Sequence, residues 1–137
     1  MDFLQASKSY YLDRSTYINL RWIAIIGQLV TINSVKFLLG FDFPYIYANI
    51  TIILGIISNL YLYYFDNNPQ ISNRSSFNYL LIDIFQLSIL LYLTGGVLNP
   101  FSIFLIIPSI FSSSNLNIKT NLTLITITLI IIIFLTF

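Results

Sequence analysis

The sequence predicts an all-α polytopic membrane protein, a transmembrane helical bundle with about five spans of which the last is truncated. Of its 137 residues, 57% are hydrophobic and only 8% are charged, against roughly 45–50% and 25% in soluble domains. The mean hydropathy is +0.84. Several apolar runs also reach the roughly 20 residues that a helix needs to cross a hydrocarbon core of about 30 Å. Composition and run length therefore predict the same class.

The chain lacks Cys, His and Glu. Within these residues this composition excludes disulfides, thiol switches, thiolate or imidazole metal sites and nucleophile–His pairs. The net charge of +1 provides no basic field for nucleic acid. We therefore expect no catalytic site, no metal site and no nucleic-acid partner in this chain, and the lipid bilayer as its surroundings.

Turn residues and polar stretches divide the chain into a tail and a membrane domain. Residues 1–15 are mixed and polar, and we expect a cytoplasmic N-terminal tail with an interfacial turn or helix; residues 16–137 form the transmembrane domain. The apolar runs predict spans at about 16–39, 44–65, 76–94, 100–118 and 122–137. The last run ends without a flanking polar residue, so we expect the chain to be a fragment.

The fourth span is the shortest, and Pro108 predicts a kink within it, because an internal proline removes a backbone hydrogen bond. It either crosses the membrane or is re-entrant. We favour crossing, because Lys119 then lies on the same side as the N-terminus. With alternating spans, most of the basic residues share one side, which the positive-inside rule assigns to the cytoplasm. That group is Lys8, Arg14, Arg21, Arg74 and Lys119, with Lys36 near the other side.

Small and hydrogen-bonding residues form one stripe on each of the first two spans. Such stripes mark where helices approach closely in lipid, so both are expected to pack inward. Arg21 and Trp22 are read as a basic and aromatic anchor at one end of the first span. The first stripe is Ala24, Gly27, Gln28, Thr31 and Ser34, and the second is Ala48, Thr51, Gly55, Ser58 and Asn59.

Asp83 lies about seven residues inside the third apolar run. An intramembrane carboxylate costs a few kcal/mol on insertion scales and is functional by default. Gln86 lies three residues further on, on the same face of the helix. A hydrogen bond that Asp83 accepts from Gln28, Asn59 or Thr51 would equally make Asp83 a structural residue, so both interpretations stay open.

Residues 94–101 form a short polar break between two apolar runs. Gly95 and Gly96 favour a turn with positive φ, and Asn99 before Pro100 is typical of an N-cap followed by the first helical residue. The break is therefore expected to be a loop that opens a helix, at the outer edge of the membrane. It is either a hairpin turn alone or a turn whose exposed N–H groups also hold a ligand carbonyl or anion.

Residues 83–101 resemble the membrane sensor region of the RegB/PrrB redox-responsive histidine kinases. That family has six spans and carries a GGxxNPF heptapeptide in a short periplasmic loop after the third. Residues 21–28 are similar to the family's Leu-Arg-Trp…Gly-Gln opening, and Pro108 lies where members tend to carry a proline. The resemblance covers about residues 16–137. Every specified position of the heptapeptide is matched, by Gly95, Gly96, Asn99, Pro100 and Phe101.

The resemblance implies a sensor domain that lies in the bacterial inner membrane and binds ubiquinone near the heptapeptide. It would signal to a kinase region in the cytoplasm. The kinase binds ATP, autophosphorylates on His and transfers the phosphate to a response regulator; such kinases are homodimers. The sixth span, the kinase region and its redox-active Cys would lie beyond Phe137.

The residues fit a quinone head, which has two carbonyl acceptors and a flat ring. Asn99 and free N–H groups of the fourth helix could donate to a carbonyl, and the glycines permit close approach. The expected ligand residues are Gly95, Gly96, Asn99, Pro100 and Phe101, with Tyr92, Phe104, Asp83, Gln86 and Gln28 as possible supporting residues.

Two other functions are weighed. One is a fragment of a polytopic transporter in which Asp83 carries a proton or ion. The other is a membrane-embedded lipid-modifying enzyme, which ranks low because paired carboxylates, His and a metal cluster are missing from the sequence. Solute transport that Asp83→Asn abolishes would favour the transporter.

Overall fold

The computed structural model describes residues 11–137 and confirms the all-α bundle. The first ten residues, and with them most of the expected N-terminal tail, lie outside the described part. Each predicted span overlaps one helical segment. The elements are β1 (Tyr11–Asp13), α1 (Arg14–Phe37), α2 (Tyr45–Phe65), β2 (Gln70–Ser72), α3 (Asn73–Leu93), η1 (Gly96–Leu98), η2 (Pro100–Ile106), α4 (Ile107–Asn115) and α5 (Ile118–Thr136). Helices α1, α2, α3 and α5 are long and apolar enough to cross a membrane.

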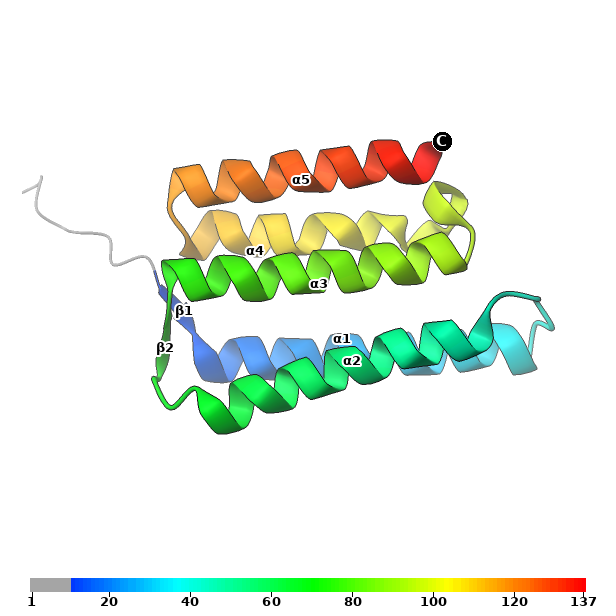
Figure 1. The fold of residues 1–137 in the computed structure, drawn as a ribbon, viewed down its shortest axis with the longest axis horizontal. Helices are drawn as coiled ribbons and strands as arrows, with labels where there is room; N and C mark the ends of the chain where they lie inside the picture. The colour runs from blue at the N-terminus through cyan, green and yellow to red at the C-terminus, as the bar shows by residue number, and fades with distance from the viewer. Residues whose placement is uncertain (1–10) are drawn as a thin grey trace, which may run out of the picture.

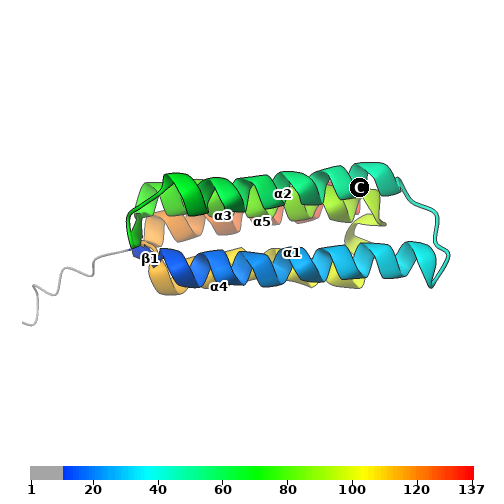
Figure 2. The same ribbon diagram turned by 90° about the horizontal axis from the view of Figure 1, so that it is seen from below.

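The helices run up and down along one axis in two layers. Figure 1 shows that α1, α3 and α5 begin at the end that holds β1 and β2, while α2 and α4 return to it. Seen from below, α2, α3 and α5 form one layer, and α1 and α4 form the other (Figure 2). Helix α1 packs against α2, α2 against α3, and α4 and α5 against α3 and against each other. α3 is therefore the central helix of the bundle.

Polar residues begin three of the four long helices. Asp13 Oδ2 accepts from the Thr16 N–H at 2.9 Å at the start of α1, and Ser72 Oγ accepts from the Ser75 N–H at 3.3 Å at the start of α3. At the start of α5, Asn117 Oδ1 accepts from Thr120 N–H at 2.9 Å. These side chains satisfy donors that the first turn of a helix leaves free.

The short antiparallel pairing of β1 with β2 differs from the expected tail and plain loop. Leu12 lies opposite Ile71, and both side chains are buried. A two-stranded ribbon is marginal alone, so burial of this apolar pair in the end of the bundle is what stabilises it. The pairing joins the start of α1 to the start of α3.

The fourth predicted span consists of two helix types and runs the length of the bundle (Figure 1). Seven residues of η2 precede nine of α4. Because a 3₁₀ helix rises about 2.0 Å per residue and an α-helix about 1.5 Å, this segment is about 27 Å long. Pro108 lies in the first turn of α4, where a missing N–H is tolerated; it marks the change from 3₁₀ to α geometry.

A cavity between α1, α3 and the fourth helical segment

A large cavity of about 1230 Å³ extends along the bundle from the Gly95–Phe101 loop to Tyr17 and Phe111. Helices α1 and α4 line it from one layer, and α3 lines it from the other. The exposed side of α1 at Ala24 and Gly27 borders this space. Its lining is mainly apolar with a few polar side chains, as is typical of sites for small molecules.

Most of the predicted ligand residues border this one cavity. Phe101 and Phe104 lie with their ring centroids 5.7 Å apart. Two predicted residues do not line it: Gly96 packs toward the end of α5, and Tyr92 is exposed, with its ring 6.5 Å from that of Phe134. The predicted residues that line the cavity are Gln28, Asp83, Gln86, Gly95, Asn99, Pro100, Phe101 and Phe104.

The polar atoms of the loop largely satisfy one another, which corrects the expectation of free donors at Asn99 and at the start of the fourth helix. Asn99 Nδ2 donates to Thr94 Oγ1 at 2.8 Å and to its carbonyl at 3.3 Å. Asn99 Oδ1 accepts from the Phe101 N–H at 2.9 Å, so Asn99 is the predicted N-cap. Gly95 and Gly96 have φ of 119° and 64°, as the double-glycine turn predicts. The loop thus contributes shape and rings more than hydrogen bonds.

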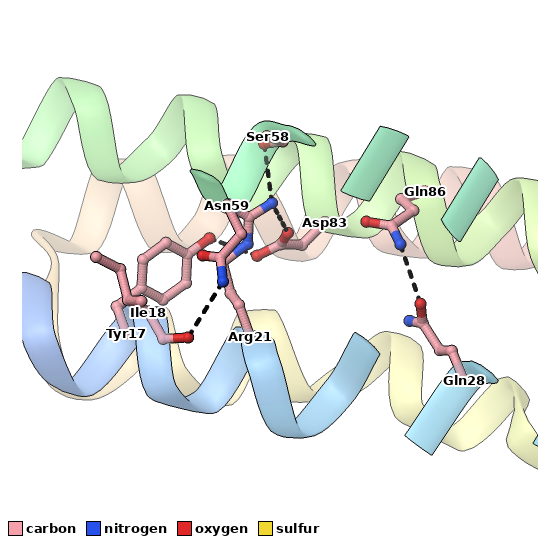
Figure 3. Close-up of polar contacts among 8 residues, drawn as sticks. All are labelled: Tyr17, Ile18, Arg21, Gln28, Ser58, Asn59, Asp83 and Gln86. Carbon is pink, nitrogen blue, oxygen red and sulfur yellow. Dashed lines mark hydrogen bonds and ion pairs between the residues drawn. The ribbon is translucent and has the colours of Figure 1, made fainter. Parts of the chain in front are cut away.

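Figure 3 shows a charged cluster formed by Tyr17, Arg21, Ser58 and Asp83. Three of its members, Tyr17, Arg21 and Asp83, line the cavity away from the loop. Arg21 Nη2 lies 2.7 Å from Asp83 Oδ1 and donates to Ser58 Oγ at 3.0 Å. The Tyr17 hydroxyl donates to Asp83 Oδ2, and the Arg21 guanidinium lies 5.5 Å from the centroid of the Tyr17 ring. Side chains of three helices, α1, α2 and α3, therefore meet in this cluster.

Two expectations about this cluster are wrong. Arg21 is not a surface anchor, because its side chain is only 5% exposed. The partners of Asp83 are Arg21 and Tyr17 rather than Gln28, Asn59 or Thr51. An ion pair at this depth keeps both charges out of lipid. Within residues 11–137, Arg21 Nη1 has no hydrogen-bond partner.

Sequence reasoning missed Arg21 and Tyr17, although a signal was present. Arg21 lies seven residues into α1 and Asp83 ten residues into α3, or about 10 and 15 Å from the starts of these helices. Both helices begin at the same end of the bundle (Figure 1). Opposite charges at comparable depths in two such spans indicate an ion pair.

A hydrogen bond between two uncharged side chains, Gln28 and Gln86, lies about one helical turn from Asp83 toward the loop. Gln86 Nε2 donates to Gln28 Oε1 at 3.0 Å and so connects α3 to α1 (Figure 3). The Gln86 amide lies over Gly55 of α2, where a Cβ on residue 55 would approach it to 2.3 Å. The Gln86 amide therefore occupies space that is open only because residue 55 is a glycine.

The two small-residue stripes have different outcomes. On α2, Ala48, Thr51, Gly55 and Asn59 are buried, as predicted for an inward stripe. On α1, Ala24 and Gly27 are exposed, and the stripe from Ala24 to Thr31 borders the cavity instead of packing on a neighbouring helix. The same pattern therefore marks helix contact in one span and a cavity wall in the other.

Comparison with known proteins gives one informative similarity. The chain is 34% identical over 110 residues to "Sensor histidine kinase RegB" of Cereibacter sphaeroides, and the aligned part is 80% of this chain and 24% of that protein. This chain thus spans about a quarter of that relative's length. No family model matches the chain, and no solved structure matches it. The predicted kinship with sensor histidine kinases of this type is confirmed.

Proposed function

We propose that this chain, a relative of the RegB-type sensor histidine kinases, is a membrane sensor domain that binds ubiquinone in the cavity beside the Gly95–Phe101 loop. In the whole protein it would control a kinase domain that uses ATP and phosphorylates a response regulator. The assembly would be a homodimer in the bacterial cytoplasmic membrane. The proposal starts from the similarity to a sensor kinase.

The assignment of ubiquinone as the ligand rests on one observation: the loop and its aromatic residues line the same cavity. Gly95, Asn99, Pro100 and Phe101 all line it, and Phe104 adds a second ring. A flat quinone ring can lie against these side chains, since aromatic rings prefer offset or edge contacts at such distances. The cavity is larger than the usual 300–1000 Å³ of a ligand pocket, which leaves room for part of an isoprenoid tail.

The distribution of basic residues supports a cytoplasmic N-terminus. Arg14, Arg74 and Lys119 belong to the starts of α1, α3 and α5, which share one end of the bundle, while Lys36 ends α1 at the other (Figure 1). Lys and Arg are enriched on the cytoplasmic side of membrane proteins. The Gly95–Phe101 loop would then lie at the outer edge of the membrane.

A sensor needs a ligand whose two forms bind with different free energies to its two states. A quinone accepts hydrogen bonds at two carbonyls, and its quinol can donate from two hydroxyls. Side chains that only donate or only accept would therefore prefer one redox form. The ratio of quinone to quinol could then shift the conformational equilibrium that the kinase reads.

Trp22 is the sole tryptophan of the chain and provides the test, because a bound quinone quenches indole fluorescence. We expect a short-tailed ubiquinone to quench Trp22 saturably in the protein reconstituted in nanodiscs, and Phe101→Ala to weaken binding severalfold. Phe85→Ala is the matched control, because Phe85 is half-exposed on α3 and is not among the residues that line the cavity. Wild-type protein that shows no saturable quenching would refute the proposal.

A further inference from the structure

The ligand's polar contact has to come from outside the loop. Asn99 Nδ2 is used by Thr94, and the Phe101 N–H is used by Asn99. These bonds hold the loop together, and a quinone that took them over would leave the Thr94 acceptors without their partner. A cavity of this size still needs a few polar groups to fix the orientation of a ligand.

The charged cluster has little hydrogen-bonding capacity that a ligand can reach. Asp83 accepts at both oxygens, from Arg21 and from Tyr17. Arg21 Nη1 has no hydrogen-bond partner among the described residues, but it is buried within the protein and is closed to a head group in this arrangement. Loss of the Arg21–Asp83 ion pair would leave a buried charge without its partner, which is costly.

The Gln28–Gln86 pair has spare capacity on both sides. Its one internal bond uses Gln86 Nε2 and Gln28 Oε1, so within residues 11–137 Gln28 Nε2 and Gln86 Oε1 make no hydrogen bond. Both side chains are half-buried and line the cavity. An amide carries two donor hydrogens and an acceptor oxygen, so Gln28 Nε2 on α1 keeps both of its hydrogens, and Gln86 on α3 keeps one hydrogen and its unused oxygen.

The pair and Phe104 lie at neighbouring depths below the loop. Gln86 precedes Thr94 by eight residues of α3, or about 12 Å. Phe104 is four residues beyond Pro100 in η2, or about 8 Å from the loop along a 3₁₀ helix. A Cβ on Gly27, next to Gln28, would meet no atom of the described residues within 4 Å. Gly27, Gln28, Gln86 and Phe104 all line the same cavity, so a ring beside Phe104 shares that cavity with the two amides.

We propose that the Gln28–Gln86 amide pair is the polar contact for the head group of the bound quinone and distinguishes its redox forms. This inference rests on the proposed function. A quinone carbonyl accepts from Gln28 Nε2, whereas a quinol hydroxyl donates to Gln86 Oε1. The quinone thus hydrogen-bonds chiefly to Gln28 on α1, and the quinol hydrogen-bonds chiefly to Gln86 on α3.

The test compares Gln28→Leu with Gln86→Leu by isothermal titration calorimetry in nanodiscs, with a short-tailed ubiquinone and, anaerobically, its quinol. Gln28→Leu should weaken binding of the quinone more than binding of the quinol, and Gln86→Leu should do the reverse. Each variant should change the ratio of the two affinities by about fivefold, the value of one hydrogen bond. Opposite shifts of the quinone-to-quinol affinity ratio in the two variants are the decisive sign. Thr31→Val, another polar position of the cavity wall on α1, is the control and should leave the ratio unchanged.

Shifts in the same direction, or no shift in either variant, would overturn this inference while quinone binding by the wild-type protein still supported the proposed function. Failure of the wild type to bind either form would refute the proposed function itself. If Gln86→Leu does not fold, Gly55→Ala replaces it, because the added methyl displaces the Gln86 amide and leaves its chemistry intact. That variant should then shift the ratio in the direction expected for Gln86→Leu, and an unchanged ratio would overturn the inference.

Discussion

Arg21 Nη2 lies 2.7 Å from Asp83 Oδ1 and joins α1 to α3 in the interior of the bundle. With the Tyr17 hydroxyl on the other carboxylate oxygen and Ser58 on the guanidinium, this pair holds three helices together. Asp83 thus links α3 to α1 in this arrangement, and the similarity to a sensor kinase offers no support for the transporter alternative.

Removal of one partner of this pair should destabilise the bundle strongly. Asp83→Leu leaves the Arg21 charge buried without a counterion, and we expect a loss of about 3–5 kcal/mol in the free energy of unfolding. The double variant Arg21→Met/Asp83→Leu should recover most of this loss, because it leaves no buried charge. Unfolding in mixed detergent micelles measures both. A double variant as unstable as Asp83→Leu alone would contradict this account.

Gly27 and Gly55 provide a matched pair of glycines in neighbouring helices. A Cβ at position 55 would come within 2.3 Å of the Gln86 amide, whereas one at position 27 meets no described atom within 4 Å. Gly55→Ala should therefore displace Gln86, break its bond to Gln28 and cost about 0.6 kcal/mol, the average for such a bond in a membrane protein. Gly27→Ala should be neutral or slightly stabilising. Equal unfolding free energies for the two variants would show that the Gln86 position is not restricted by Gly55.

The two glycines of the loop should differ in the same kind of experiment. Both have positive φ, but a Cβ on Gly96 would lie 2.9 Å from the backbone oxygen of Leu135, and one on Gly95 meets no described atom within 4 Å. Gly95→Ala should cost about 1–2 kcal/mol, from backbone strain alone. Gly96→Ala should cost more, because the end of α5 has to move. Thermal unfolding in detergent compares them, and the reverse order would contradict the packing of the loop against α5.

The start of α1 should respond to pH through Asp13. Hydrogen bonds from the side chain and backbone of Thr16 hold the pKa of this exposed carboxyl below its usual value. Its stabilising contribution is therefore complete above the ordinary pKa of about 3.9 and is lost as pH falls through the lowered pKa. The ¹⁵N shift of the Thr16 amide should report this transition, and Asp13→Asn, which keeps an N-cap acceptor, should abolish it. An amide shift that titrates equally in the variant would rule out Asp13 as the cause.

The helices could be predicted because length and hydropathy alone determine which segments can span a membrane. The caps at Asn99 and the positive φ at Gly95 and Gly96 are local, so they too could be read from neighbouring residues. The role of the α1 stripe could not, because Ala24 and Gly27 suit a close helix contact and an open wall equally well. The choice between them depends on where α4 lies, which is a tertiary fact.

Partners of polar groups were the least predictable part. Asp83 has polar candidates on two other helices, and only the relative rotation of α1 and α3 selects Arg21. Likewise, whether Asn99 is free to bind a ligand depends on the Thr94 acceptors beside it. Hydrogen-bond competition of this kind requires coordinates of both groups.

The pairing of β1 with β2 restrains α1 and α3 relative to each other at one end only. Leu12 opposite Ile71 fixes the distance between the first residues of the two helices, whereas the other end of α1 continues into the turn at Gly40. A molecule that binds between α1 and α3 would therefore tilt the two helices apart, with the strands as the pivot. A ligand bound deep in the membrane would therefore change the angle between α1 and α3 at the strands and leave their separation there unchanged.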